Sequence, residues 1–386
     1  MQDPIQGLQK VNRRELKRRK AALKAQSERK VGEIYVASQF KLTVMRFRRN
    51  KLARVGFVAL CLIYFIAIFA NFLVPYGAQE YNPKITNMSP RGMHWIDADG
   101  NFSWRPFVYE ITQDYDPVTF APIHVEDTTS KAYVSLFVKG SPYKLLGLIP
   151  CDVHLFGVEQ MPEMAGKAFG IYLFGTDQAG RDLFSRTLIG SQISATVCLV
   201  GVLLGVCAGF FGGWVDTLVS RLIDILLAFP SLLLAITVVA ILGSGTENTA
   251  IAIAIFSIPS IARMVRGIVM SNKDAEYIQA CRVMGASNAR MIFTHIIPNA
   301  ISQIIVNITL NLGTAILTAS SLSFLGLGVQ PPAPEWGAML STGRDVIRAY
   351  PLAVLIPGIA ITLVVMSFSL VGDGLRDALD PKALER

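Results

Sequence analysis

Long apolar runs alternate with polar segments along this chain of 386 residues. A run of about 20 apolar residues can cross the ~30 Å hydrocarbon core of a bilayer as a helix. Six such runs occur, the third and fifth with some polar residues, near positions 55–75, 192–211, 222–242, 249–269, 301–320 and 352–371. The pattern predicts an all-α polytopic membrane protein with six transmembrane helices.

A second pattern occupies the segment 76–187, between the first two runs. Every second residue from 132 to 138 is small or aliphatic (Ala132, Val134, Leu136, Val138), which is the spacing of a half-buried strand. Asp99 and Gly100 lie between Ile96 and Phe102, as in a hairpin turn. We therefore expect a small β-rich domain to be inserted here.

Composition and charge give this frame an orientation. Hydrophobic residues make up 52% of the chain, charged residues 17%, and the mean hydropathy is +0.44, the balance of a membrane protein. Residues 1–54 contain 16 Lys or Arg against 4 Asp or Glu, whereas residues 76–187 contain 9 against 13. Basic flanks stay in the cytoplasm, so both termini and the 270–300 connection are expected inside and the insertion outside.

The net charge of +8 is concentrated in the basic arm, residues 1–54, beside the first apolar run. Anionic membrane lipid is a simpler partner for such an arm than nucleic acid, and we expect no nucleic-acid binding. The arm either only sets the topology as a solvated tail or binds a specific lipid or partner. The run that follows is too long, and its charged arm too extended, for a cleaved signal, so it should remain as an anchor.

Motifs for catalysis and metal binding are missing from the sequence. Of the five cysteines only Cys151 lies in the expected outside region, and the four histidines are scattered, which predicts neither a disulfide framework nor a metal site. No phosphate-binding loop, G-x-S-x-G or H-E-x-x-H pattern occurs. We expect no catalytic residues and no cofactor.

Isolated polar and glycine residues near the apolar runs have structural interpretations. The glycine pairs at 243 and 245 and at 326 and 328 are expected to mark helix ends. Asp224 follows Arg221 by three residues, the spacing of an ion pair along a helix. Acidic residues are otherwise almost absent from the apolar runs, which argues against a proton-relay transporter.

The connection at 272–298 combines two stripes with a central glycine. Polar residues recur every third position, at Lys273, Glu276, Gln279 and Arg282, beside a second stripe of Ala275, Ile278 and Cys281. Gly285 can end such a helix in the left-handed conformation, and Ser287 can cap the next one. The pattern predicts two short helices meeting at a bend, a shape that fits a groove on a partner protein. The alternative is an amphipathic helix on the membrane surface.

Seven further strings occur in a consistent order along the chain. They are FRRNKLARVG (47–56), FGTDQAGRDLFSR (174–186), GFFGGWVD (209–216), AFPS (228–231), SLSFLGLGVQP (321–331), PEWG (334–337) and GDGLRDALDP (372–381). Together with the 277–299 segment they resemble the membrane subunits of dipeptide and oligopeptide ABC importers, on the side of the C-type permease. The match covers most of the chain.

The resemblance implies a type I ABC importer fold with six transmembrane helices. The β-rich extracytoplasmic insertion departs from the family's pattern, because it is much longer than a minimal member would need. It implies a heterodimer with a homologous permease, two ATP-binding subunits on the cytoplasmic face, an extracytoplasmic solute-binding protein and a place in the bacterial inner membrane. ATPase coupling would fall to Gln279, Ala280, Cys281, Arg282, Gly285, Ala286, Ser287 and Pro298. Gln279 stands where the family's pattern has Glu, so docking would rest on shape and on neighbouring arginines.

The divisions expected from this resemblance are a cytoplasmic arm at 1–54, the first helix at 55–75, the insertion at 76–187, the permease core at 188–374 with coupling helices at 272–298, and a cytoplasmic tail at 375–386. The cargo implied is a di- or oligopeptide, with oligosaccharides or other small solutes as the alternative. An ATP-independent carrier or channel is the alternative of a different class.

Two outer segments have both structural and functional interpretations. A charged turn before the second helix consists of Thr176, Asp177, Gly180, Arg181 and Asp182, and capping and ion pairing are favoured there over substrate contact. Glu335 and Trp336 follow a proline-rich loop and could dock a delivery protein or anchor the chain at the membrane interface.

Overall fold

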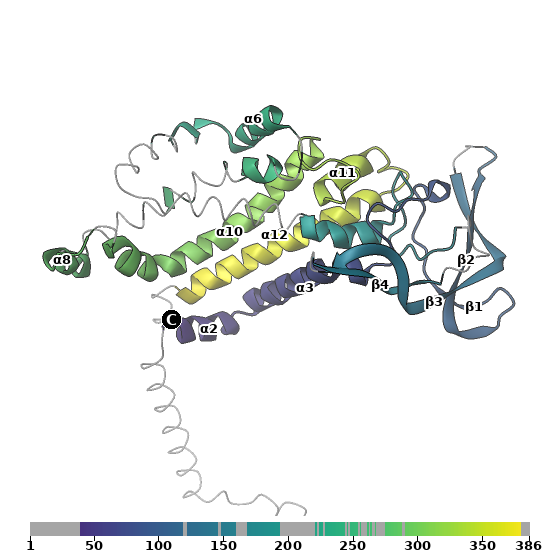
Figure 1. Cartoon of the computed structure of the whole chain (residues 1–386), viewed down its shortest axis with the longest axis horizontal. Coiled ribbons are helices and arrows are strands. Elements are labelled where there is room, and N and C mark those ends of the chain that lie inside the picture. Colours follow the sequence, from purple (N-terminus) through teal and green to yellow (C-terminus); the bar gives the residue numbers. More distant parts are fainter. Residues whose placement is uncertain are drawn as a thin grey trace, which may run out of the picture.

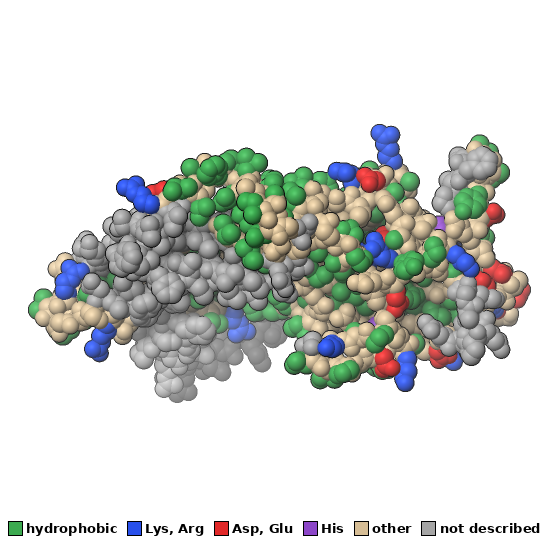
Figure 2. Space-filling view, turned by 45° about the horizontal axis from the view of Figure 1, so that its top comes forward, with side chains coloured by type: hydrophobic (Ala, Val, Ile, Leu, Met, Phe, Trp, Pro, Cys, Tyr) green, Lys and Arg blue, Asp and Glu red, His purple; other side chains and the backbone are tan. Residues whose placement is uncertain are grey.

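The computed structural model describes residues 39–118, 122–145, 148–159, 168–193, 228–243, 275–287 and 290–379, with shorter stretches at 221, 224–226, 245, 248–253, 255, 261, 263–264 and 267. The described part is elongated (Figure 1). A β-sheet lies at one end of the long axis and helix α8 at the other, and three long helices run between them. On the face seen in Figure 2, charged side chains lie mainly toward these two ends.

The three long helices are α3 (Lys51–Leu73), α10 (Ile297–Phe324) and α12 (Leu352–Leu379). By length and composition alone, α3, α12 and the Gln303–Phe324 part of α10 could each cross a membrane. They cover the first, fifth and sixth predicted spans. Their apolar side chains are largely exposed in the single chain, as expected for helices that meet lipid or other subunits.

The remaining predicted spans are described only in part. Helix α6 (Ser231–Leu242) begins directly after Pro230 and forms the second half of the third span. Residues 194–211 of the second span and much of the fourth lie outside the described residues. The sequence suggests that Asp224 pairs with Arg221, but the ion pair that the structure shows for Asp224 is with Arg263, at 2.8 Å. This long-range contact ties the third predicted span to the fourth.

Local chemistry sets both ends of α3. The side chain of Asn50 caps the helix by accepting a hydrogen bond from the N–H of Ala53 at 3.2 Å. The preceding helix α2 (Gln39–Arg49) has basic residues in its last turn, which favours a position next to anionic headgroups. At the far end Val74 is extended, because Pro75 sterically disfavours helical geometry in the residue before it.

The long helices pack closely where glycines face their neighbours. A methyl group added to Gly374 of α12 would lie 2.1 Å from the Cβ atom of Ala53, at the start of α3. Such close approach through small residues is typical of membrane helices. Helix α11 (Trp336–Arg344) packs on α10 and α12 beyond the sheet-side end of α10. The shared core includes Leu60, Ala315, Ile316, Ala319, Trp336, Met339, Val364 and Phe368.

The insertion forms a four-stranded antiparallel sheet in the order β1 (His94–Ile96), β2 (Phe102–Tyr115), β3 (Pro122–Leu145) and β4 (Ile149–Val158). A single 3₁₀ turn, η1 (Pro83–Ile85), precedes it. The first half of β3 pairs with β2 and the second half pairs with β4. The expected hairpin at Asp99 and Gly100 is present, because Ile96 pairs with Phe102 across it. The β-rich prediction for this segment is confirmed.

The predicted alternation along β3 holds only in part. Ala132 and Val134 are buried, as the pattern predicts. Leu136, expected on the buried side, is instead 70% exposed, and its neighbour Phe137 is 63% exposed. Phe137 has a positive φ of 57°, which interrupts the regular strand geometry at this point. The buried face therefore ends at Val134.

Specific contacts join the sheet to the end of α3. His154 of β4 is buried, with Nδ1 2.7 Å from the carbonyl oxygen of Val74 and Nε2 3.1 Å from that of Ser141. The N–H of Ile171 donates to the hydroxyl of Tyr76 at 2.8 Å. A small core of Val108, Ala132, Val134 and Ile171 closes the inner side. The sheet is therefore fixed to the end of the membrane helix.

The packing of α3 on α12 gives a first prediction. We expect Gly374→Ala to destabilise the protein by about 1–3 kcal/mol, because the added methyl forces the two helices apart. Thermal unfolding in detergent micelles measures the effect. Gly358→Ala on the same helix is the control, because its methyl would meet only Leu340 at an ordinary 3.9 Å. Equal midpoints for the two variants would contradict the close contact.

Candidate functional site

Helix α8 (Glu276–Val283) is a short amphipathic helix with one buried face. Ile278 and Cys281 are buried, and they pack with Met291, Ile296, Ala275 and Ala286 into a small core of their own. The predicted apolar stripe is therefore the face that holds α8 against the segment that follows it. Glu276, Gln279 and Arg282 of the polar stripe are exposed. Lys273, the first residue of that stripe, lies outside the described residues.

Gly285 ends α8 in a Schellman motif. Its φ is +80°, and its N–H donates to the carbonyl of Arg282 at 3.0 Å. The N–H of Ala286 donates to the carbonyl of Cys281 at 3.0 Å, which is the second bond of the motif. A side chain is disfavoured at this φ, although a Cβ atom would meet nothing within 4 Å. The glycine is required by backbone geometry and not by crowding.

Ser287 begins the next helical segment, as the sequence predicts. Its hydroxyl oxygen accepts a hydrogen bond from the N–H of Arg290 at 3.3 Å. The segment itself is different from the prediction, because it is not a separate short helix. It winds as a π-helix, η3 (Met291–Ile296), directly into α10. Pro298, near the start of α10, cannot donate a backbone hydrogen bond, and the wider winding lies just before it.

The exposed end of α8 carries apolar residues that the pattern of polar and apolar stripes does not predict. Val283 is 89% exposed and Met284 is 77% exposed, next to the bend at Gly285. Exposed apolar side chains beside exposed polar ones are typical of a surface that binds another protein. The signal in the sequence is an apolar pair directly before the glycine, at the end of an otherwise polar stripe.

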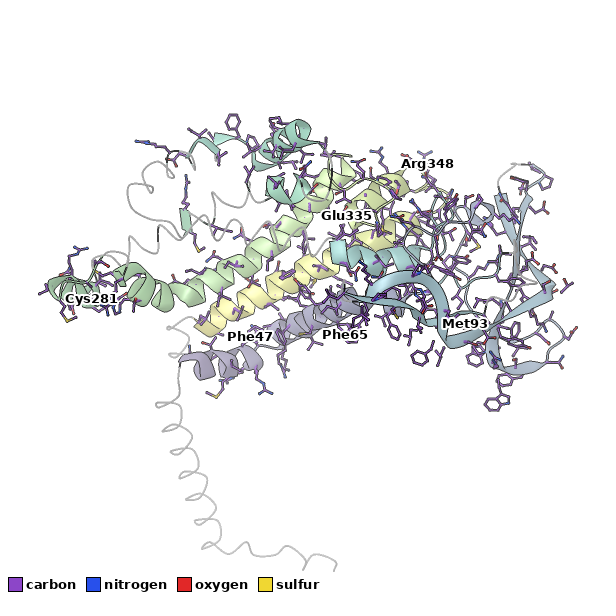
Figure 3. All side chains as sticks on the ribbon, in the orientation of Figure 1. Phe47, Phe65, Met93, Cys281, Glu335 and Arg348 are labelled. Atoms are coloured by element: carbon purple, nitrogen blue, oxygen red, sulfur yellow. The ribbon has the colours of Figure 1, made fainter. Side chains whose placement is uncertain are left out.

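This bend lies far from the sheet. Figure 3 shows Cys281 at one end of the molecule and Met93, beside the sheet, at the other, with Phe47 and Phe65 between them. Helix α10 runs continuously from the bend toward α11 (Figure 1). One helix therefore links the bend to the sheet side of the molecule.

A network of buried charges occupies the sheet side. Asp177 pairs with Arg181 at 2.7 Å and lies 3.5 Å from Arg186. Arg186 is 4% exposed, and its Nη1 donates to the carbonyls of Ala78, after α3, and Pro332, before α11, at 2.8 and 3.0 Å. Pairing and backbone contacts compensate the burial of the charge. Arg186 thus holds three segments together, and the expected pairing of Arg181 with a carboxylate is confirmed.

Asp182 caps the helix at 183–193 from a fully buried position. One carboxylate oxygen accepts from the N–H and the hydroxyl of Ser185, at 2.8 and 2.6 Å. Burial raises the pKa of Asp182 to about 7, and nearby Asp177 adds to the rise, while the Ser185 bonds oppose it.

Thr176 of the same turn also has structural contacts. Its hydroxyl donates to the carbonyl of Ile85, and the N–H of Met88 donates to the Thr176 hydroxyl oxygen.

Glu335 and Trp336 are both buried, at 2% and 4% exposure. Glu335 caps α11 by accepting from the N–H of Ala338 at 2.9 Å, and the indole of Trp336 donates to the carbonyl of Thr187 at 2.9 Å. Neither side chain reaches the surface in this structure. Docking of a delivery protein here stays a prediction, and it would depend on the loop that these residues shape and not on direct contact with them.

A cavity of about 290 Å³ lies between the charged turn and α11. Asp177, Arg181 and Thr342 contribute its polar lining, and Val346 and Ala353 contribute apolar walls. Gln178 spans its rim by donating to the carbonyl of Thr342 at 2.8 Å. Among the described residues, no group of three or more His, Cys, Asp or Glu could hold a metal ion.

Comparison with known proteins places this arrangement in a family. Residues 201–385 match the binding-protein-dependent transport system inner membrane component, and residues 38–90 match the N-terminal transmembrane domain of oligopeptide transport permease C. The dipeptide transport system permease protein DppC of Alkalihalophilus pseudofirmus is 52% identical over 217 residues, 54% of this chain and 71% of that protein. The chain belongs to this family of permeases. It is the inner membrane component of an ABC transport system that depends on a binding protein, and it carries no ATPase site.

Other relatives of this permease are named for a different cargo. The glutathione transport system permease protein GsiD of Pectobacterium atrosepticum is 46% identical over 244 residues, 61% of this chain and 80% of that protein. GsiD of an Escherichia coli strain is 51% identical over 217 residues, covering 54% and 72%. A solved inward-facing structure of the MetNI methionine ABC transporter aligns with a TM-score of 0.39 and 19% identity, over 50% of this chain and 93% of that one.

The buried position of Asp182 predicts a pH dependence of stability. Its folded-state pKa of about 7 lies above the usual value of about 4, so the folded permease holds this proton more tightly than the unfolded chain does. The free energy of unfolding should therefore fall as pH rises from about 4 to about 7. Asp182→Asn keeps an acceptor for Ser185 but removes this titration.

We expect the Asn variant to gain on the order of 2–4 kcal/mol relative to wild type between pH 5 and pH 8. Unfolding midpoints of both proteins across this range measure the difference. A constant difference between wild type and variant would show that Asp182 does not titrate there.

Proposed function

We propose that the bend at α8 binds an ATPase subunit and that this permease imports peptides delivered by a solute-binding protein. The observation that carries the coupling role is the joint at Gly285. Two hydrogen bonds of the Schellman motif fix the backbone at Gly285 and Ala286. A small buried core holds α8 against η3, and η3 continues into α10. A displacement of α8 therefore moves α10 as one body.

The surface for the ATPase would be the exposed side of α8. It combines the polar side chains of Gln279 and Arg282 with the apolar ends of Val283 and Met284. The mixture supports docking by shape and apolar contact, with Arg282 or Arg290 available for charge pairing. Glutamine at position 279 keeps hydrogen-bonding capacity without the charge, so no salt bridge from this position is required.

The orientation follows from the charge pattern and the shape together. Helix α2, with its basic last turn, lies on the side of the molecule away from the sheet, as does the end of α12 (Figure 1). We infer that both termini and α8 are cytoplasmic and that the sheet is extracytoplasmic. Six spans, with residues 188–374 as the core and a tail at 375–386, complete a type I importer half in this proposal.

The partners proposed are a homologous permease forming a heterodimer, two ATP-binding subunits and an extracytoplasmic binding protein. The exposed apolar surfaces of α3, α10 and α12 support a chain that packs against lipid and a second subunit. ATP-driven closure of the ATPases would bring the two coupling bends together and rock the helix bundles to open the pathway outward. For the insertion sheet three roles are open: docking the binding protein, covering the outer mouth of the pathway, or a lineage-specific decoration without a part in transport.

Disrupting the bend should uncouple transport from ATP. Proline at position 285 cannot adopt φ +80° and cannot donate to Arg282. We expect Gly285→Pro to abolish uptake of labelled dipeptide by the reconstituted transporter, while membrane insertion stays normal. Gly285→Ala, which strains the backbone by about 1–2 kcal/mol, should give intermediate uptake.

The matched control is Gly92→Ala, because Gly92 lacks a positive φ and an added methyl meets nothing within 4 Å. Its uptake should equal that of the wild type. Wild-type uptake in the Gly285→Pro transporter would refute the coupling role. Uptake by this permease alone, without ATPases, would favour the alternative class of carrier or channel.

The peptide assignment comes from the cargoes for which the relatives are named, dipeptides and glutathione, which are both small peptides. Oligosaccharides remain the second candidate. A thermal-shift screen of the solute-binding protein encoded beside this permease separates the two. We expect short peptides and not oligosaccharides to raise its unfolding temperature, and the reverse result would transfer the assignment to sugars without affecting the coupling role.

A further inference from the structure

The hairpin of β3 and β4 carries exposed apolar side chains where a soluble domain would have polar ones. Leu148 is 82% exposed, Ile149 is 57% exposed, and Phe137 further back on β3 is 63% exposed. The sequence from 145 to 150 contains no charged residue. Hairpin ends are usually polar because they face water, and contiguous exposed apolar side chains mark a contact surface. We call Phe137, Leu148 and Ile149 the hairpin patch.

One member of the hairpin patch, Phe137, lies against the end of the membrane helix α3. The ring of Phe137 lies 6.3 Å from that of Phe72, in the last turn of α3. Strand β4 lies along the same end of α3 (Figure 1), held there by the contact of His154 with Val74. From Lys51 to Phe72 the helix rises about 32 Å, the thickness of the hydrocarbon core. Phe72 and the ring of Phe137 beside it are therefore level with the membrane surface.

Neighbouring residues match a lipid boundary. Leu62, Phe65 and Ile68 on α3 are 58%, 53% and 46% exposed, so apolar surface continues down the helix from the hairpin. Two long basic side chains, Lys139 and Lys144, are exposed on the hairpin, and Lys139 lies 4.0 Å from Asp152. Lysines beside apolar groups are typical of the headgroup layer, where the stem is apolar and the ammonium group contacts phosphate.

We propose that the hairpin patch rests in the lipid leaflet on the sheet's side of the membrane. The insertion sheet is then held to the bilayer at two places, the junction with α3 and the end of the hairpin, and cannot swing freely above the pathway. Lipid is favoured over a protein neighbour because the patch extends the apolar face of a spanning helix and is bordered by lysines. The proposal does not depend on the cargo or on the coupling role.

Spin labels read the surroundings of the hairpin directly. After replacement of the five native cysteines and a check that uptake is retained, Phe137→Cys and Leu148→Cys are labelled in the complete transporter in lipid nanodiscs. Collision rates with oxygen, which partitions into lipid, and with a water-soluble nickel chelate are compared. Val118→Cys is the control, because Val118 is 84% exposed on the β2–β3 connection of the same domain.

We expect oxygen to exceed nickel accessibility at positions 137 and 148 and nickel to exceed oxygen at position 118. Nickel-dominated accessibility at either hairpin position would overturn the proposal. Protection of the hairpin labels from both reagents would also overturn it, in favour of a protein neighbour such as a second permease. All three labelled positions are exposed, so the labels should not disturb folding. Loss of uptake would report a folding failure separately from the accessibility measurement.

Discussion

A backbone that crosses a bilayer must satisfy its hydrogen bonds internally, and this constraint governs the arrangement of the permease. The described membrane segments are accordingly helices, and irregular backbone is confined to their ends. Asn50 caps the start of α3 and Val74 ends it before a proline. Helices that cannot use the hydrophobic effect against one another in lipid associate through close packing, which is why Gly374 faces Ala53 across the α3–α12 contact.

The two ends of the molecule are held by different interactions. At α8 a glycine with a positive φ and a small buried core make a rigid bend that remains exposed to a partner. On the sheet side, Arg186 and Asp177 hold the segments after α3 and before α11 in a buried network. Helix α10 runs from the bend toward α11 and so connects the two ends (Figure 1).

Some of the site follows from local sequence because the physical cause is local. Gly285 and Ser287 could be assigned their roles from the sequence, since helix ends depend on residues within one turn. The continuity of η3 with α10 could not be predicted from the sequence, because a proline near a helix start is compatible with a break or with wider winding. The burial of Glu335 also required the structure, since the pattern of a polar residue after a proline-rich loop is the same for a cap and for a docking group.

The sequence by itself determined the apolar spans, the basic arm, the β-rich insertion and the bend at Gly285, because hydropathy, charge and turn chemistry are encoded in runs of neighbouring residues. Only the tertiary structure decided that Asp224 pairs with Arg263, that Arg186 joins three segments, and that the β3–β4 hairpin lies against α3. Each of these depends on residues dozens to more than a hundred positions apart. Such contacts leave no periodic signal in one sequence, since they are selected by how the packed helices and sheet bring distant side chains together.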